Sequence, residues 1–545
     1  MINTNLIIKN ILNNRGYYSD EEIEEFLSSK PKETFDPFLL LNMEAGVDLI
    51  IKKIEENKKI CIYGDYDADG ITSICVLMSV FNSIGANVIY YIPSRFDEGY
   101  GLNIDAIDSL HSKGVDLIIT VDCGTVSFNE VLHAQNLGMD VVVTDHHRVT
   151  DIKADCILIN PKQEECQYPF KELAGCGVAF KLAQALQFKI GFSKSVIMDV
   201  LDFVAIGTIG DIVPLVGENR TIVKYGVSKI NKYRRKSIST LINSIYGKKV
   251  YINSEKISFG IVPHLNAAGR IKDAKIGVQL FLSDDINEIE RLSAELVTLN
   301  SIRKEKQKET YDQCISLYKE QCAEEFFPVI YAKEAHEGIT GIVAGKIKDD
   351  LGRPVAIVTD QDEQLKGTSR GIEGVDVYET FKALEEFFIQ FGGHKGACGF
   401  RIHKTQLPYL RSGLKKYFDG IDISEFDCEM KFDDKLLVSQ ATNQLVVDLN
   451  ILEPFGQSNP KPKFLFNGVT HSGVRLVGKY KEHLAFKISD GENRLSCILF
   501  NKGKEAIDVF SENTKINVYG ELSINTGFDN SVQVIVDKIG GYDEF

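Results

Sequence analysis

The sequence predicts a multidomain α/β protein with a parallel-sheet domain, a long connecting helix, a second α/β domain and a C-terminal β-barrel. Three patterns carry this prediction. Apolar runs alternate with helical stretches over 58–285, residues 286–324 contain no Pro or Gly, and short alternating runs follow from about Leu452. At roughly 150 residues per domain, a chain of 545 residues has room for three or four such units.

Composition excludes several classes of protein. Hydrophobic residues make up 44% and charged residues 26%, which is typical of globular proteins and not of disordered chains. No apolar run reaches the roughly 18 residues of a membrane-spanning helix, and the N-terminus lacks the features of a signal peptide, so we expect a cytoplasmic protein. The net charge of −15 argues only weakly against nucleic-acid binding, because a local groove can still be basic. The 11 cysteines form no C-x-x-C pair, so neither a zinc ribbon nor a thioredoxin motif is indicated.

The first elements along the chain indicate where the parallel sheet lies. Residues 1–57 have the pattern of amphipathic helices, whereas KICIYGDYDADGITSICVLMSVF, from Lys59, reads as a strand, a Gly/Asp turn and a helix. VDLIITVDCGT and DVVVTDHH are further β-branched runs, each ending in acidic or histidine residues. This alternation is typical of parallel sheets with crossover helices, in which ligands bind at the carboxyl ends of the strands.

The remaining elements follow in order. Apolar residues recur at helical spacing over 286–324, which predicts one long helix. A second α/β domain follows, with strands in FFPVIYAKE and PVAIVTD and helices in GITGIVAGKIKDDLG and VDVYETFKALEEFFIQFG. The C-terminal runs, with turns every 8–12 residues or so, favour a small barrel in which exposed aromatic residues could stack on bases.

The strongest chemical signal is GDYDADG at 64–70. Asp65, Asp67 and Asp69 stand at alternate positions directly after a predicted strand. Crowded carboxylates raise one another's pKa, so a fold tolerates them readily only where cations neutralise them. A calcium-binding EF-hand loop shares the first six positions, but its twelfth position requires Glu and is Val76 here.

Three further groups extend this signal within the same α/β unit. They are Asp122 in VDCG, then Asp145, His146 and His147 in TDHH, and finally Asp211 in IGTIGD. Carboxylates combined with imidazole suit Mn²⁺, and also Mg²⁺ where the histidine is dispensable. The sequence therefore predicts a divalent-metal cluster.

Two other interpretations explain less. GTSRG fits the G-x-S-x-G motif of serine hydrolases, and Asp376 and His394 follow Ser369 in the hydrolase order. No helix is predicted directly after Ser369, however, and a triad leaves the Asp/His groups unexplained. No G-x-x-x-x-G-K-[ST] motif occurs, and GCGVAF at 175–180 lacks the third Gly of a dinucleotide-binding loop, so ATP and NAD are not implied.

GDYDADG, VDCGT, TDHH and GTIGD resemble, in order and spacing, the four motifs of the DHH phosphoesterase superfamily. NAAGR (266–270), HEGITGIVAGKI (336–347), TSRG (368–371) and GGHKGACGF (392–400) resemble the associated DHHA1 domain and its surroundings, and LEPFGQSNPKPKF (452–464) resembles the start of the OB-type barrel of one exonuclease branch. The resemblance covers about 50–545. With the N-terminal helical segment (1–57) and the connecting helix (286–324) that the sequence pattern predicts, it implies a DHH catalytic domain (58–285), a DHHA1 substrate-binding domain (325–425) and an OB-type domain (426–545).

The resemblance also implies a two-metal site. Asp122 would bridge the ions and act in catalysis with His147, which would face the scissile phosphate, while Asp145 supports the motif. Many members carry a His where this chain has Tyr63, so we expect Asp65 to take its place. The implied metal ligands are Asp65, Asp67, Asp69, Asp122, His146 and Asp211.

Residues of the second domain would hold the substrate. His394, in the Gly-rich turn GGHKGACGF, would hydrogen-bond the scissile phosphate and act in catalysis. Arg270, Ser369 and Arg370 resemble phosphate-binding residues of the family. Arg95 is a candidate for a 5′ phosphate, although a lone Arg is often a surface charge.

The function that the resemblance implies is metal-dependent 5′–3′ digestion of single-stranded DNA in repair and recombination. Two alternatives remain open. Phosphodiesterases for oligoribonucleotides or cyclic dinucleotides usually lack the barrel and the long helix, and inactive replication scaffolds have typically lost their metal carboxylates. The expected partners are single-stranded DNA and, by family, a single-strand binding protein and a helicase, with no membrane.

Overall fold

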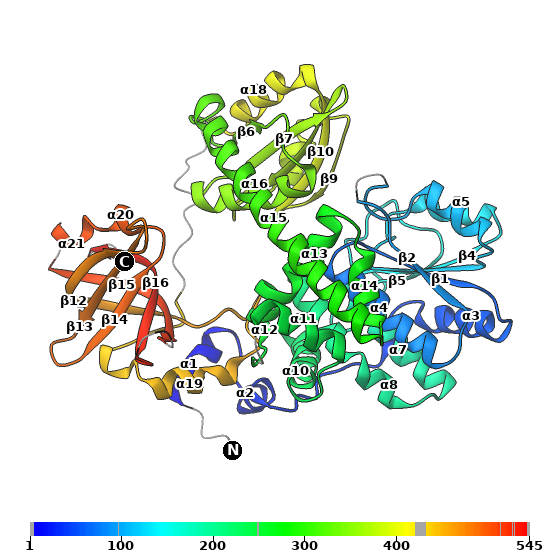
Figure 1. Ribbon diagram of the computed structural model, residues 1–545, viewed down its shortest axis with the longest axis horizontal. Helices are drawn as coiled ribbons and strands as arrows, with labels where there is room; N and C mark the ends of the chain where they lie inside the picture. Colours follow the sequence, from blue (N-terminus) through cyan, green and yellow to red (C-terminus); the bar gives the residue numbers. More distant parts are fainter. Residues whose placement is uncertain are drawn as a thin grey trace.

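The computed structural model describes residues 5–541 except 96–97, 248–249, 420–431, 513, 526 and 528. Its strands form three sheets, and each sheet belongs to a separate body of the molecule (Figure 1). The predicted fold class, including its order of domains, is confirmed. The predicted boundary at 425/426 lies outside the described residues.

The first sheet is parallel throughout, in the order β2–β1–β3–β4–β5. Because all its strands run the same way, the carboxyl ends of β1, β3 and β4 meet at one edge, as the sequence predicts. The strands are β1 (Ile60–Gly64), β2 (Val88–Tyr91), β3 (Leu117–Val121), β4 (Asp140–Thr144) and β5 (Ile157–Ile159).

Helices cover both faces of this sheet. Helices α5 (Ile104–Ser112) and α6 (Phe128–Asn136) bury one face, while α3 (Met43–Glu55), α4 (Ala68–Ser83) and α7 (Gly175–Ile190) pack against the other. Further helices enlarge the hydrophobic core on the face that α3, α4 and α7 cover. They are α8 (Lys194–Asp199), α9 (Leu201–Gly210), α10 (Gly217–Lys232), α11 (Lys236–Tyr246), α12 (Ser254–Lys256), a π-helical turn (Ile257–Ile261), α13 (Val262–Ile271) and α14 (Lys275–Leu282).

Helix α15 (Ile286–Gln321) has 36 residues and connects the first body to the second sheet, whose order is β6–β7–β8–β10–β9. Helix α16 (Glu337–Leu351) packs on β7 and β8. The body also contains β6 (Val329–Tyr331), β7 (Val355–Gln361), β8 (Gln364–Arg370), α17 (Val377–Lys382), β9 (Gln390–His394), β10 (Ala397–His403) and α18 (Leu407–Tyr417).

One predicted helix in this body is wrong over its second half. The pattern VDVYETFKALEEFFIQFG predicts a helix, but α17 ends at Lys382 and the segment continues into β9. Phe388 and Phe391 pack there against Phe381 and Phe400, which ties the segment to the sheet. The predicted Gly-rich turn is therefore a β-hairpin, in which Gly393 has a φ of 148° that disfavours other residues.

The third sheet closes into a barrel, because β12 pairs with both β13 and β15. Its strands are β11 (Asp434–Lys435), β12 (Lys463–Val477), β13 (His483–Ser489), β14 (Arg494–Leu499), β15 (Lys515–Ile524) and β16 (Val532–Gly541). The helices beside them are α19 (Asn443–Leu449), α20 (Gly503–Ala506) and α21 (Val509–Glu512).

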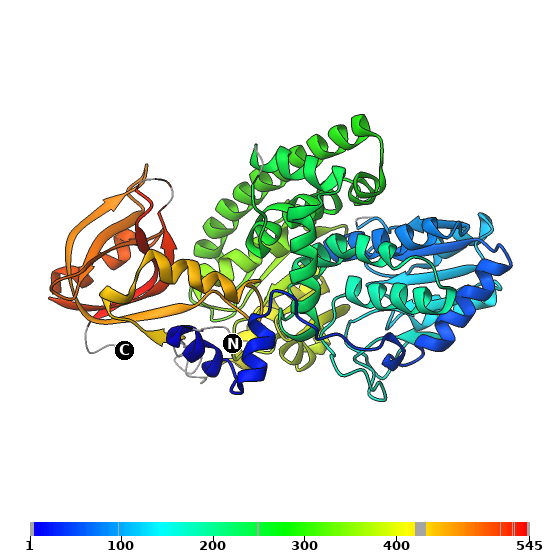
Figure 2. The same ribbon diagram turned by 90° about the horizontal axis from the view of Figure 1, so that it is seen from below.

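The N-terminal helices divide between two bodies. Helices α1 (Leu6–Asn14) and α2 (Asp20–Leu27) pack into the barrel core, whereas α3 packs on the first sheet. Figure 2 shows α1 and α2 in blue beside the orange C-terminal segment. Arg220 of α10, which is 3% exposed, stacks on Phe26 and donates to the carbonyls of Phe26, Leu452 and Glu453. This buried guanidinium therefore joins the first body, the N-terminal helices and the barrel.

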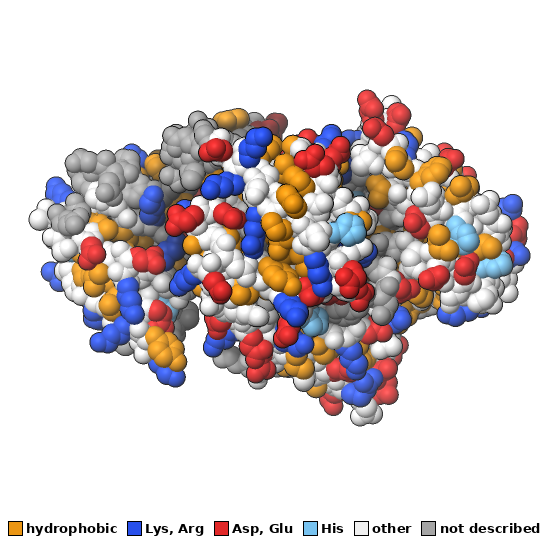
Figure 3. Space-filling model, turned by 90° about the horizontal axis from the view of Figure 1, so that it is seen from above, with side chains coloured by type: hydrophobic (Ala, Val, Ile, Leu, Met, Phe, Trp, Pro, Cys, Tyr) orange, Lys and Arg blue, Asp and Glu red, His pale blue; other side chains and the backbone are white. Residues whose placement is uncertain are grey.

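Among the described residues, no helix is long and apolar enough to cross a membrane. Seen from above, Lys and Arg side chains lie between Asp and Glu side chains over much of the surface (Figure 3). This face therefore carries mixed charges and not a surface of one sign.

Candidate metal centre

The predicted metal ligands converge at the carboxyl edge of the first sheet. Asp65 follows β1, Asp122 follows β3, and Asp145 and the two histidines follow β4. Asp67 caps α4 and Asp69 lies in its first turn, while Asp211 ends α9. The structure thus brings together residues that lie up to 146 positions apart in the chain, from Asp65 to Asp211.

His146 lies at the centre of this group. Its Nε2 is 3.1 Å from Asp122 Oδ1, 3.5 Å from Asp211 Oδ2 and 4.0 Å from Asp69 Oδ2. A neighbouring group places ligand atoms of Asp65, Asp67 and Asp122 within 4.8 Å of one another. Asp122 therefore lies between two sets of potential ligands.

Hydrogen bonds from backbone amides hold two of the carboxylates in place. Asp67 Oδ1 accepts from the amides of Asp69 and Gly70, at 2.9 and 3.1 Å, as helix N-caps do. Asp69 accepts from the amides of Gly175 and Cys176 at the start of α7, at 2.7 and 2.8 Å. The positive end of the α7 dipole faces this carboxylate.

The backbone around Asp122 is strained and closely packed. Asp122 has a φ of 60°, which is uncommon for residues other than Gly and occurs at functional sites. A Cβ on Gly175 would lie 2.6 Å from Asp122 Oδ1, and one on Gly70 would lie 2.4 Å from the Asp65 carbonyl oxygen. Glycine at these two positions lets the loops approach the carboxylates.

The electrostatics of the group call for cations. Burial and neighbouring carboxylates raise the pKa values of Asp65, Asp122 and Asp211 well above the usual range, and burial and Asp67 raise that of Asp69 to about 6. Asp65 Oδ1 is buried without a hydrogen-bond partner among the described residues. Buried charges are normally paired or bound to metal, so this oxygen fits a metal ligand.

The imidazole of His146 suits the same role. Burial lowers its pKa to about 3, so the ring is neutral near neutral pH and can offer a nitrogen lone pair to a metal. The donor set of carboxylate oxygens and one imidazole fits Mn²⁺, and also Mg²⁺. Tyr63 is fully buried, and its hydroxyl donates to the Gly101 carbonyl at 3.0 Å, so this hydroxyl is engaged in a hydrogen bond and is not among the candidate metal ligands.

Asp145 and His147 form an ion pair beside the candidate metal ligands. Asp145 accepts from the Thr125 amide at 2.9 Å and lies 2.7 Å from His147 Nδ1. Although burial opposes charge on both, their interaction lowers the pKa of Asp145 and raises that of His147 to about 9. The side chain of His147 is 47% exposed. It is therefore a cationic ring that faces the solvent beside the ligands.

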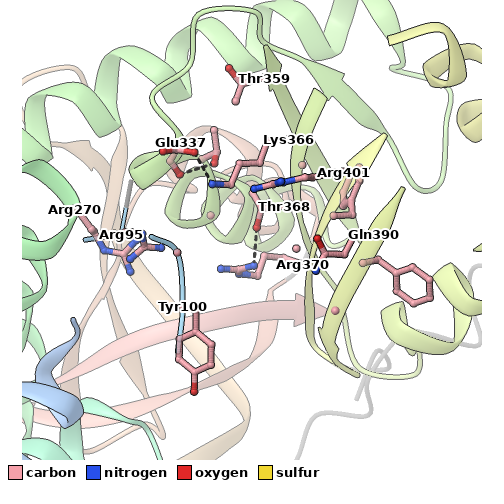
Figure 4. A pocket seen from close by; sticks show the side chains of 18 of the residues that line it. Arg95, Tyr100, Arg270, Glu337, Thr359, Lys366, Thr368, Arg370, Gln390 and Arg401 are labelled. Carbon is pink, nitrogen blue, oxygen red and sulfur yellow. Dashed lines mark hydrogen bonds and ion pairs between the residues drawn. The ribbon is translucent and has the colours of Figure 1, made fainter. Parts of the chain in front are cut away.

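A cavity of about 460 Å³ opens beside this centre, between the loop after β2 and the face of the second sheet (Figure 4). Arg95, Arg270 and Arg370 line it together with Tyr100. Arg270 donates to the Gly338 carbonyl at 3.0 Å, and burial and the nearby Arg95 lower its pKa to about 9. Three arginines from distant segments thus face one space.

The assignment of Ser369 to phosphate binding needs correction. Its side chain is 0% exposed, and its hydroxyl donates to the Cys398 carbonyl at 3.0 Å. Successive residues of a strand point to opposite faces, so Thr368 and Arg370 line the cavity while Ser369 does not. The same burial leaves no room for the serine-hydrolase interpretation.

Thr368, Lys366 and Arg401 are among the lining residues that sequence reasoning missed. Counting back in steps of two from Arg370 along its strand would have found the first two. His394 ends β9 at the surface, where partial desolvation and the charges of Arg370 and His147 lower its pKa. It therefore lies within electrostatic range of both the cavity and the metal centre.

Comparison with known proteins gives consistent matches along the chain. The sequence matches the DHH family N-terminal domain over 59–208, the DHHA1 domain over 326–420 and the RecJ OB domain over 432–538. It is 37% identical to the single-stranded-DNA-specific exonuclease RecJ of Bacillus subtilis, covering 95% of this chain and 66% of that protein. For the RecJ of Escherichia coli the identity is 31%, covering 98% of this chain and 95% of that one.

A solved structure agrees with these matches. RecJ from Thermus thermophilus in complex with Mn²⁺ superimposes with a TM-score of 0.82 at 27% sequence identity, covering 97% of this chain and 75% of that one. The Mg²⁺ complex of the same protein gives a TM-score of 0.79 at 26% identity, with coverage of 98% and 75%.

Proposed function

The chain belongs to the RecJ family of single-stranded-DNA-specific exonucleases, and on that premise we propose that it hydrolyses single-stranded DNA from the 5′ end with Mn²⁺ or Mg²⁺. The observation that carries the proposal is the convergence of buried carboxylates and His146 beside an arginine-lined cavity. We further propose, by family, that it acts in DNA repair and recombination in the cytoplasm.

The metal ligands are proposed from the two sets of donor atoms. Asp65 and Asp67 would hold one ion, Asp69, His146 and Asp211 the other, and Asp122 would touch both. Bound divalent ions acidify a water molecule and stabilise the charge that develops on phosphate oxygens. The protein's part is to fix these donors before substrate arrives, and the amides that hold Asp67 and Asp69 do so.

Two histidines can donate hydrogen bonds to the substrate's phosphates. His147, with a pKa raised to about 9, is protonated at neutral pH and would donate to the scissile phosphate. His394 would donate to the same phosphate from the second domain. Asp145 accepts from His147 Nδ1 and so orients the ring, and Nε2, which also lies 3.4 Å from the Tyr100 hydroxyl, is the nitrogen that would donate to the substrate.

The arginines support a preference for the 5′ end. A terminal phosphate carries a charge of about −1.5 to −2 at neutral pH, as phosphate monoesters do, whereas an internal phosphodiester carries only a single charge. Arg95, Arg270 and Arg370 offer three guanidinium groups in one cavity, which suits the dianion. We therefore propose that these three residues, with Thr368, hold the 5′-terminal phosphate.

Two observations favour this function over its alternatives. The closed barrel and the 36-residue helix are features that small-substrate phosphodiesterases usually lack. The carboxylates that inactive scaffolds have typically lost all stand in one cluster. A single-strand binding protein and a helicase remain proposed partners by family, as does the domain division at 57, 285, 324 and 425.

The test is a digestion of 5′-phosphorylated single-stranded DNA with Mn²⁺, using duplex DNA and RNA of the same sequence as controls. A 3′ label should yield a ladder that shortens progressively, whereas a 5′ label should yield mononucleotide at once. Asp122→Asn, which preserves side-chain shape, serves as the matched inactive variant. Digestion from the 3′ end, or equal digestion of duplex DNA, would contradict the proposal.

A further inference from the structure

The cavity extends beyond the three arginines along one face of the second sheet. Lys366, Thr368 and Arg370 occupy alternate positions of β8, so their side chains share a face, and all three line the cavity. Arg401 of β10 lies opposite Lys366 in the antiparallel register and also lines it. At about 3.3 Å per residue, the row from Arg370 to Lys366 spans roughly 13 Å, which is far longer than one phosphate group.

The charge of the cavity exceeds what a single phosphate needs. Its described lining contains five cations, which are Arg95, Arg270, Lys366, Arg370 and Arg401, and one carboxylate, that of Glu337. Five positive charges less one negative leave four positive charges. A terminal monophosphate supplies about −1.5 to −2, so about two positive charges of the cavity remain unbalanced, one of them at the end where Lys366 and Arg401 face Glu337.

That far end is already arranged around an anion. Lys366 Nζ lies 2.6 Å from Glu337 Oε2, and their side chains are 34% and 27% exposed. Figure 4 shows Lys366 and Arg401 together beside Glu337, on the opposite side of the cavity from Tyr100. The neutral side chains of Thr359 and Gln390 line the same end. An anion that entered here would meet Lys366 and Arg401, whose two positive charges are only partly balanced by the single negative charge of Glu337.

We propose that this end of the cavity binds the additional phosphates of a 5′-polyphosphate, so that the enzyme also digests strands that begin with a 5′-triphosphate. The inference rests on the proposed function and extends its substrate class. A triphosphate carries about four negative charges, matching the net charge of the cavity. Polymerases that start a strand without a primer produce such ends, so de novo initiation is the class of reaction that supplies this substrate.

The chemical step is the one proposed for ordinary ends. A water oxygen attacks the phosphorus of the first internucleotide phosphodiester, and the bond from that phosphorus to O3′ breaks. The O3′ atom takes a proton and leaves as the 3′-hydroxyl of a released nucleoside 5′-triphosphate. The shortened strand keeps a 5′-monophosphate and enters the ordinary reaction.

The experiment compares one single-stranded DNA sequence, labelled at its 3′ end, with a 5′-monophosphate or a 5′-triphosphate, in Mn²⁺. Wild-type protein should digest both and release an intact nucleoside triphosphate, identified by mass spectrometry. The double variant Lys366→Gln/Arg401→Gln should lower the ratio of the triphosphate rate to the monophosphate rate by about tenfold or more, because each lost contact is a charge-assisted hydrogen bond. Lys348→Gln, a change on α16 outside the cavity lining, is the matched control and should leave the ratio unchanged.

Two results would overturn the inference while leaving the proposed function intact. Wild-type protein could digest the monophosphate strand and leave the triphosphate strand untouched, or the double variant could show an unchanged ratio. The monophosphate rate of each variant reports that it has folded. Failure to digest the monophosphate strand would instead overturn the proposed function, and this inference with it.

Discussion

Replacing Asp69 with Asn should stabilise the metal-free protein near neutral pH, although it should damage the metal centre. Asp69 is fully buried beside other carboxylates, and burial and Asp67 raise its pKa from 3.8 to about 6. The folded protein therefore binds this proton more tightly than the unfolded chain does. The corresponding stability is present below about pH 4 and is lost as the pH rises through about 6.

The magnitude follows from the shift in pKa. Each unit is worth 1.36 kcal/mol, so the ionised Asp69 destabilises the metal-free protein by about 3 kcal/mol above pH 7. Asn removes the charge, but its amide N–H₂ must face one of the two backbone amides that donate to Asp69, those of Gly175 and Cys176. Deducting about 1 kcal/mol for that mismatch leaves an expected gain of about 2 kcal/mol.

The assay is urea unfolding at about pH 8 in the presence of a chelator. The transition to be compared is the one that, in wild-type protein, moves to a different urea concentration when Mn²⁺ is added, because that transition reports on the body that binds metal. The gain should vanish at about pH 4, where Asp69 is protonated. Asp145→Asn is the matched control, and it should lower the free energy of unfolding where Asp69→Asn raises it. The reason is that the pKa of Asp145 is lowered, so its ionised form stabilises the folded protein. If Asp69→Asn loses stability in the chelator at pH 8, hydrogen bonding outweighs repulsion in this cluster and the reasoning is refuted.

Three further changes test other parts of the molecule. Asp122→Ala should reduce cleavage of end-labelled DNA below detection at saturating Mn²⁺, because both sets of donors share this carboxylate, and substantial residual cleavage would contradict the assignment. His394→Ala should lower kcat by ~10²–10³ with Mn²⁺ binding unchanged in calorimetry; loss of Mn²⁺ binding would make His394 a ligand. Arg220→Met should destabilise the protein to urea by about 3 kcal/mol, since it leaves buried carbonyls without donors, and unchanged stability would argue against that role.

The convergence of the candidate metal ligands could be predicted because it depends on local rules. A β-branched run followed by Asp or His marks the carboxyl end of a parallel strand, and such ends meet at one edge of the sheet. Asp65, Asp122 and Asp145 reach the site in this way. Asp211 does not, because it ends helix α9; the sequence placed it in the same α/β unit, and the resemblance to a family implied its role as a ligand.

Other features depend on packing between distant segments, which periodicity does not report. The apolar stripes of α1 and α2 predict that each helix is buried, but not that the barrel buries them. The segment after Lys382 is rich in Phe at neighbouring positions, so its pattern suits a helix and a strand alike. The error at Ser369 was different, because strand alternation already excluded it from the face that carries Arg370.

Helix α13 explains how the metal centre and the cavity keep a fixed separation. Asn266 Oδ1 accepts from the Ala68 amide at 2.7 Å, in the loop that carries the metal-ligand carboxylates. One turn later Gly269 packs so closely against that loop that a Cβ would lie 2.6 Å from the Tyr66 carbonyl oxygen. The next residue, Arg270, lines the cavity and donates to Gly338 of the second domain. Because one short helix makes all three contacts, it would hold the proposed terminal-phosphate site and the proposed metal centre at a fixed distance, which suits an enzyme that removes nucleotides in uniform steps.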